Sequence, residues 1–119
     1  MQLQNRFKDE DKIRVWIDHP YSALSGSNQN CSLHHIYSCS EDDTDSIYNG
    51  IMLDYEEHKE ADTHNQFEMG DERRIKYLAL AIRQIMRSGY INKPRDIRFL
   101  EKIKPDFEKA VALLRDNII

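Results

Sequence analysis

The segment that decides the fold of this chain is residues 33–62, which read LHHIYSCSEDDTDSIYNGIMLDYEEHKEAD. Two adjacent histidines, His34 and His35, stand at its start. Asn49 follows the second histidine by fourteen residues, and His58 follows Asn49 by nine. Histidine suits a hydrolytic site, because a neutral imidazole can bind a cation or accept a proton near neutral pH. The order of these side chains therefore predicts a site that combines a metal ion with a general base.

Two strands and a helix are expected around this segment. A first strand is predicted at residues 32–37, and a second near residues 46–53 would complete a hairpin. The following run EEHKEADTHNQF has no Pro or Gly and is rich in helix formers, so we expect a helix from about Tyr55. The acidic run EDDTD at residues 41–45 is expected to be a solvated hairpin loop. The predicted fold class is α+β, with a small ββα core.

Spacing on the expected helix indicates which side chains can share a cation. At about 100° per residue, His58 and Asp62 lie roughly 40° apart, whereas His64 lies about 240° from His58. His58 and Asp62 can therefore bind one ion. His64 is left as an ordinary surface residue, with a phosphate contact or substitute ligand as the alternative. A histidine nitrogen with a carboxylate oxygen suits Zn, Ni or Mn and tolerates Mg.

The same segment resembles the HNH, or ββα-metal, endonuclease family, and in particular its small phage-encoded members. LHHI is similar to the start of the family motif, SIYNGIML to the segment around its central asparagine, and EEHKEAD to its helical end. The resemblance implies that His35 is the general base and that His34 and His58 are metal ligands. Asn49 would brace the loop that aims His35, through hydrogen bonds to backbone. Asp62 stands where many relatives have a second helical histidine, and it is the third expected ligand.

This resemblance covers about thirty residues and implies a metal-dependent endonuclease that cleaves DNA. The expected partner is double-stranded DNA, and the expected cofactor is one divalent cation. The products would carry 5′-phosphate and 3′-hydroxyl ends. Two zinc-binding Cys-x-x-Cys pairs, common in the family, are missing, since the chain has only Cys31 and Cys39. Two alternatives stay open. One is a degenerate HNH fold that binds DNA or a protein without cutting, and the other is an iron site of the oxygenase type.

Composition indicates one modest globular domain over residues 1–119, with 39% apolar and 32% charged residues. The core is expected at about residues 31–66 and a basic helical part at about 71–119. No apolar run of membrane-spanning length and no signal-peptide pattern is visible, so a cytoplasmic location, in a bacterial or phage-infected cell, and no membrane partner are expected.

Charge is distributed unevenly along the chain. Residues 1–72 contain 5 Lys and Arg against 16 Asp and Glu, a net charge of −11, whereas residues 73–119 contain 12 against 5, a net charge of +7. Many acidic residues are expected at or beside the metal site. The basic part could follow a phosphate backbone, with Arg73, Arg74 and Lys76 as candidate phosphate contacts, or it could be an ordinary solvated helix face.

Outside the motif, helices are expected where apolar residues recur at helical spacing or where Pro opens a helical pattern. The ranges are 71–88, 95–103 and 106–117. Apolar residues between Phe7 and Ile17 form an N-terminal element whose type the sequence leaves open, and His19 is expected in a turn. The helical part could also pack against a second copy of the chain, which makes a homodimer possible.

Overall fold

The computed structural model describes residues 6–62, 70–86 and 88–117. Within these residues the chain forms five α-helices, one short 3-10 helix and one antiparallel pair of strands, which confirms the predicted α+β class. In chain order the elements are α1 (Asp9–Asp18), β1 (Ser32–His35), η1 (Ile47–Asn49), β2 (Gly50–Leu53), α2 (Tyr55–Asp62), α3 (Asp71–Ile85), α4 (Pro94–Lys102) and α5 (Lys104–Arg115).

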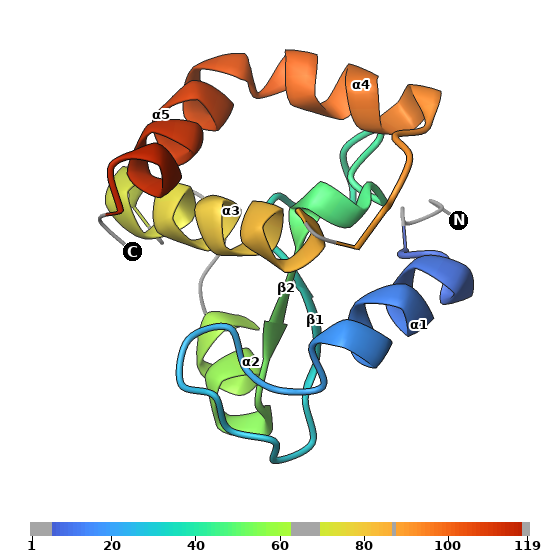
Figure 1. Ribbon diagram of the computed structural model, residues 1–119, viewed down its shortest axis with the longest axis vertical. Coiled ribbons are helices and arrows are strands. Elements are labelled where there is room, and N and C mark those ends of the chain that lie inside the picture. Colours follow the sequence, from blue (N-terminus) through green and yellow to red (C-terminus); the bar gives the residue numbers. More distant parts are fainter. Residues whose placement is uncertain (1–5, 63–69, 87, 118–119) are drawn as a thin grey trace.

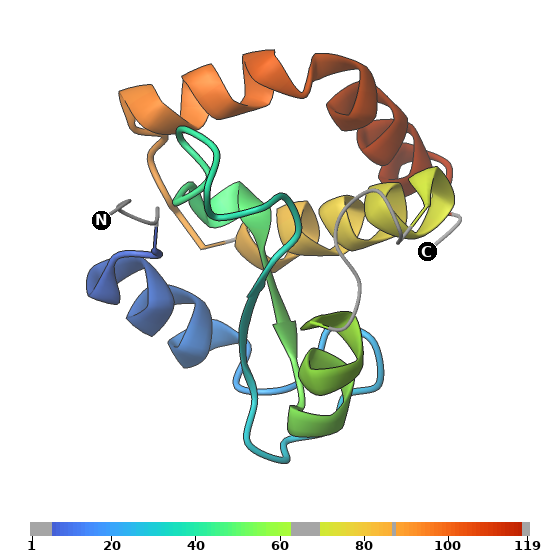
Figure 2. The same ribbon diagram turned by 180° about the vertical axis from the view of Figure 1, so that it is seen from behind.

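The elements surround α3, which crosses the middle of the molecule (Figure 1). The hairpin and α2 lie on one side of this helix, and α4 and α5 lie on the other, as the opposite view also shows (Figure 2). The helix is buried on most of its surface, because Ile75, Leu78 and Ile82 recur at the predicted spacing and face the core. Its end comes at Ile85 rather than at residue 88. The amide and the hydroxyl of Ser88 both donate to the Ile85 carbonyl, and Gly89 follows with a φ of 73°.

The hairpin pairs β1 with β2 so that His34 lies opposite Ile51 and His35 opposite Gly50. Both strands are shorter than predicted. The last backbone hydrogen bond runs from the Ile36 amide to the Asn49 carbonyl at 2.9 Å, and beyond it the side chain of Asn49 replaces backbone pairing. Its Oδ1 accepts a hydrogen bond from the Tyr37 amide at 2.7 Å, and its Nδ2 donates to the Tyr37 carbonyl at 3.0 Å. The chain before β2 therefore forms a 3-10 turn instead of more strand.

The backbone hydrogen-bonding groups on the outer edge of β2 are paired with a side chain of α3. Gln84 is buried, and its Nε2 donates to the Gly50 carbonyl while its Oε1 accepts from the Met52 amide. A glutamine thus takes the place of a third strand. These hydrogen bonds hold the hairpin against α3. They therefore set the position of β1 and its histidines relative to that helix.

Helix α2 begins with a reciprocal cap. The Glu57 amide donates to Asp54 Oδ1 at 2.8 Å, and the Asp54 amide donates to Glu57 Oε1 at 2.9 Å. Ser22, from the long connection before β1, donates its hydroxyl to the same carboxylate oxygen at 2.5 Å. Ala61 is fully buried beneath the helix. These contacts set the direction in which the opposite face of α2 points.

The C-terminal helices agree with the predicted ranges, and each begins one or two residues earlier than expected, with Pro94 or Pro105 in its first turn. The N-terminal element, left open by the sequence, is the helix α1. Among its apolar residues Val15 is buried, whereas Ile13, Trp16 and Ile17 are exposed. No helix in the described ranges is long and apolar enough to cross a membrane.

The acidic loop of residues 41–45 does not match the solvated hairpin loop that was predicted. It lies against α4, where Arg98 pairs with Asp43 at 3.0 Å and Arg95 pairs with Asp45 at 3.1 Å. This loop is therefore part of an internal charge contact, and its carboxylates are not beside the expected metal site. The prediction failed because the partners are 50 and 55 residues apart in the sequence.

Candidate metal centre

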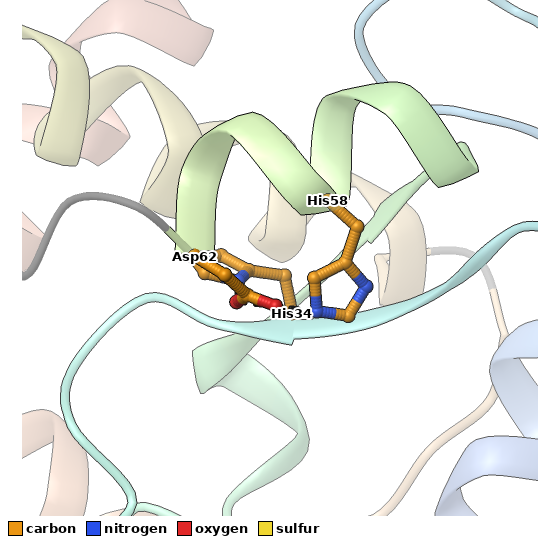
Figure 3. A group of neighbouring side chains, drawn as sticks. All are labelled: His34, His58 and Asp62. Carbon is orange, nitrogen blue, oxygen red and sulfur yellow. Dashed lines mark ion pairs between the residues drawn. The ribbon is translucent and has the colours of Figure 1, made fainter.

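Three of the predicted site residues meet where β1 faces α2 (Figure 3). His34 comes from the strand, and His58 and Asp62 come from successive turns of the helix. Asp62 Oδ1 lies 3.3 Å from His34 Nδ1 and 3.5 Å from His58 Nε2. The candidate ligand atoms of the three residues all lie within 4.8 Å of one another. The predicted four-residue spacing on the helix thus brings the two helical side chains together.

The distances suit a small divalent ion. Two ligands of a tetrahedral site lie about 3.4 Å apart when the metal–ligand bonds are about 2.1 Å, the usual value for zinc with nitrogen or oxygen. The two contacts to Asp62 Oδ1 are within about 0.1 Å of that separation. Three protein ligands leave further positions for water or a substrate. The set of two histidines and one carboxylate also occurs in non-haem iron sites.

The site is closed on one side and open on the other. His34 is buried between the strand and the helix, and its ring lies edge-on to that of His58, with centroids 5.2 Å apart. The Asp62 side chain is 63% exposed. An ion bound here would therefore be held from the protein side by the imidazoles, and it would be reached from solvent past the carboxylate.

Burial keeps His34 in the form that a metal needs. Desolvation is the largest effect and the nearby His58 ring adds to it, so the pKa of His34 falls to about 4, although the Asp62 carboxylate acts in the opposite direction. The imidazole is therefore neutral at physiological pH. A neutral ring has a lone pair to offer, and a cation does not first have to displace a proton from an imidazolium.

Ser32 is a site residue that the sequence interpretation missed. Its Oγ lies 2.6 Å from His58 Nδ1. When this hydroxyl accepts a hydrogen bond from Nδ1–H, the lone pair of Nε2 faces Asp62, which is the tautomer that can bind a metal at Nε2. Ser32 and His34 are two residues apart on β1 and so share a face of the strand. That spacing could have identified the serine once the strand was predicted.

His35 lies apart from the three-residue group. Successive residues of a strand point to opposite faces, so His35 faces away from α2. Its ring stacks on Phe7, with centroids 3.9 Å apart and an angle of 17° between the planes. Phe7 also covers Gly50 so closely that a β-carbon there would lie 2.9 Å from the ring. His35 is partly exposed, and the face it occupies is that of the N-terminal segment.

Asn49 is fully buried and makes hydrogen bonds to backbone alone. Besides its two bonds with Tyr37, its Nδ2 donates to the Thr44 carbonyl at 2.9 Å. These contacts tie both ends of the loop after β1 to the start of β2. Asn49 therefore stabilises the hairpin from a buried position, where its side chain is not accessible to a substrate.

The predicted phosphate contacts differ in their surroundings. Arg73 pairs with Glu60 and contacts the Tyr77 hydroxyl, and Arg74 pairs with Asp106 at 3.0 Å. Both guanidinium groups are thus engaged within the protein, whereas Lys76 is exposed. His64, the alternative ligand, belongs to residues 63–69, which lie outside the described part of the chain.

Comparison with models of protein families, with curated proteins and with solved structures found no match. The interpretation of the site therefore depends on the motif and on the geometry of the three side chains.

Proposed function

We propose that His34, His58 and Asp62 bind one divalent cation and that this protein is a metal-dependent endonuclease that hydrolyses phosphodiester bonds in DNA. The observation that carries the proposal is the meeting of these three side chains where a hairpin packs on a helix. Helical spacing predicts that His58 and Asp62 can share an ion, and the resemblance to the HNH family implies His34 and His58 as ligands. Mg, Mn, Ni and Zn are the candidate ions.

The ion would supply the positive charge that phosphodiester hydrolysis requires, by stabilising the charge that develops on the phosphate. Asp62 marks the open side of the site, since its side chain is the most exposed of the three ligands. Ser32 orients the His58 ring through Nδ1. Asn49 supports the loop after β1 and takes no part in the chemistry.

His35 is the proposed general base, and its position restricts the direction from which a substrate can approach. Because His34 and His35 point to opposite faces of β1, a phosphodiester can approach both only along the edge of the strand that does not pair with β2. The stacked Phe7 ring fixes the plane of the His35 imidazole. A water molecule that attacks from that face would lose its proton to His35.

A non-cutting DNA- or protein-binding module is the second candidate function. The observation that favours it is the separation of His35 from the ligand group, because a site without a base near its metal can bind without catalysing hydrolysis. In that case the metal would stabilise the junction of β1 and α2 only.

A plasmid-nicking assay with purified protein and Mg²⁺, Mn²⁺, Ni²⁺ or Zn²⁺ separates the two candidates. The endonuclease should convert supercoiled plasmid to open circles with at least one of these ions, and His58→Ala should abolish that activity. The matched control is His19→Ala, which removes a histidine whose contact is with Tyr21. Binding of the ion without any nicking by the native protein would favour the non-cutting module.

A further inference from the structure

A cavity adjoins the candidate metal centre on its open side. It has a volume of about 360 Å³, and its lining includes both helical ligands together with Asn30, Ser32, Tyr55 and Lys59. Pockets that bind small molecules or single groups of a larger ligand usually measure about 300–1,000 Å³. The cavity is therefore large enough for one nucleotide and too small for a base pair with its neighbours.

Helix α2 presents one continuous stripe to this cavity. Tyr55, His58 and Asp62 are spaced by three and four residues, and Lys59 lies beside them, so all four side chains share a face of the helix. Tyr55 is 56% exposed, although it is the first residue of a helix that packs on the hairpin. A large aromatic ring thus stands in solvent one turn away from a candidate metal ligand.

The charges along the stripe favour a ligand with a phosphate. Lys59 is exposed and lines the same cavity as His58 and Asp62, and a cation held by those two residues would add positive charge to its wall. The Asp62 carboxylate repels phosphate when no cation is bound. Phosphate binding at this wall should therefore depend on the metal ion.

We propose that this cavity binds one unpaired nucleotide of single-stranded DNA, whose base stacks on Tyr55 and whose phosphate faces Lys59 and the metal ion. The inference rests on the proposed nuclease function and names its substrate class. Stacking on a side chain needs a base with a free face, and in a duplex both faces of each base are covered by its neighbours. Aromatic rings beside a positively charged wall are the usual means of binding single strands without sequence preference.

Fluorescence anisotropy with a labelled 12-nucleotide single strand tests this inference. The protein carries His35→Ala and is loaded with Mn²⁺, and a gel run after each titration checks that the strand is intact. Tyr55→Ala should weaken binding of the single strand about fivefold or more, the loss expected for one stacked base. Tyr55→Phe should retain the affinity, since the ring is kept. Tyr21→Ala, which removes an exposed tyrosine that does not line the cavity, should have no effect.

Two further measurements make the result decisive. A titration with Mn²⁺ alone should give the same affinity for Tyr55→Ala and for the parent, which excludes a disturbed metal site. A duplex of the same sequence should bind more weakly than the single strand and should be insensitive to Tyr55→Ala. Equal single-strand affinity with and without the Tyr55 ring, or tighter binding of the duplex, would overturn the inference.

Failure of this inference and failure of the nuclease proposal give different results. A protein that nicks plasmid but binds the single strand equally well after Tyr55→Ala would keep its proposed function and lose its proposed cavity ligand. A protein that never cleaves, but whose affinity for the single strand depends on Tyr55, would keep the cavity ligand and lose the hydrolytic role.

Discussion

At the scale of single residues, the site depends on which face of a strand or helix each side chain occupies. His34 and His35 are neighbours in the sequence, yet one faces α2 and the other stacks on Phe7. Helical spacing correctly indicated that His58 and Asp62 could share an ion. Strand alternation could have shown equally well that the two adjacent histidines do not share a face.

Replacing His35 with Ala tests its proposed role as the base. The rate of plasmid nicking should fall by about 10²–10⁴-fold, the usual contribution of a positioned general base, while the affinity for the metal ion stays unchanged. The measurement pairs a nicking time course with a titration of the ion. Unchanged activity would remove His35 from the mechanism and leave it as the partner of Phe7.

Replacing Asp62 with Ala tests the least conventional ligand. The native protein should melt at a higher temperature when Mn²⁺ or Zn²⁺ is added, because an ion that binds the folded state alone stabilises it by mass action. This increment should disappear in Asp62→Ala. Asp71→Ala, which removes a carboxylate at the start of α3, should keep it. An undiminished increment in Asp62→Ala would mean that another group, such as His64, is the third ligand.

At the scale of elements, short-range patterns determine most of what could be predicted. The helical spacing in α3 and the prolines that open α4 and α5 act within a few residues, and the sequence shows them directly. The ends of the strands could not be predicted in the same way. They depend on Asn49, whose side chain takes over the pairing of Tyr37 from twelve residues away.

Asn49→Ala should therefore destabilise the hairpin and through it the site. The change leaves buried hydrogen-bonding groups of Tyr37 and Thr44 without their partner, and each such group costs about 1–3 kcal/mol. We expect the free energy of unfolding to fall by at least about 2 kcal/mol, measured by urea denaturation. Asn92→Ala, at an exposed asparagine that accepts from Tyr48, should change it by less than about 0.5 kcal/mol. Equal effects of the two changes would contradict this role of Asn49.

At the scale of the whole molecule, part of the uneven charge of the sequence is used in ion pairs within the fold. Basic side chains of α3 and α4 pair with carboxylates of the acidic half, such as Asp43, Asp45 and Glu60. Composition alone could not distinguish these internal pairs from a surface that binds phosphate, because the partners are far apart in the sequence. The predicted phosphate contacts thus divide into two arginines that form ion pairs within the fold and one exposed lysine.

Two basic residues of α3 separate these roles. Arg74→Ala removes the pair with Asp106 from a largely buried position, and the free energy of unfolding should fall by about 1–3 kcal/mol. Lys76→Ala should change it by less than about 0.5 kcal/mol, since that side chain is exposed. Urea denaturation of both variants gives the comparison. A larger loss for Lys76→Ala than for Arg74→Ala would contradict the assignment of Arg74 to the fold.

The central claim is that His34, His58 and Asp62 hold one divalent ion. The measurement that tests it most directly is anomalous X-ray scattering from crystals of the native protein grown with Zn²⁺ or Mn²⁺. We expect one strong anomalous peak about 2.0–2.2 Å from His34 Nδ1, His58 Nε2 and a carboxylate oxygen of Asp62. Crystals that diffract well at the metal absorption edge but show no peak between β1 and α2, or a peak at other residues, would contradict the claim.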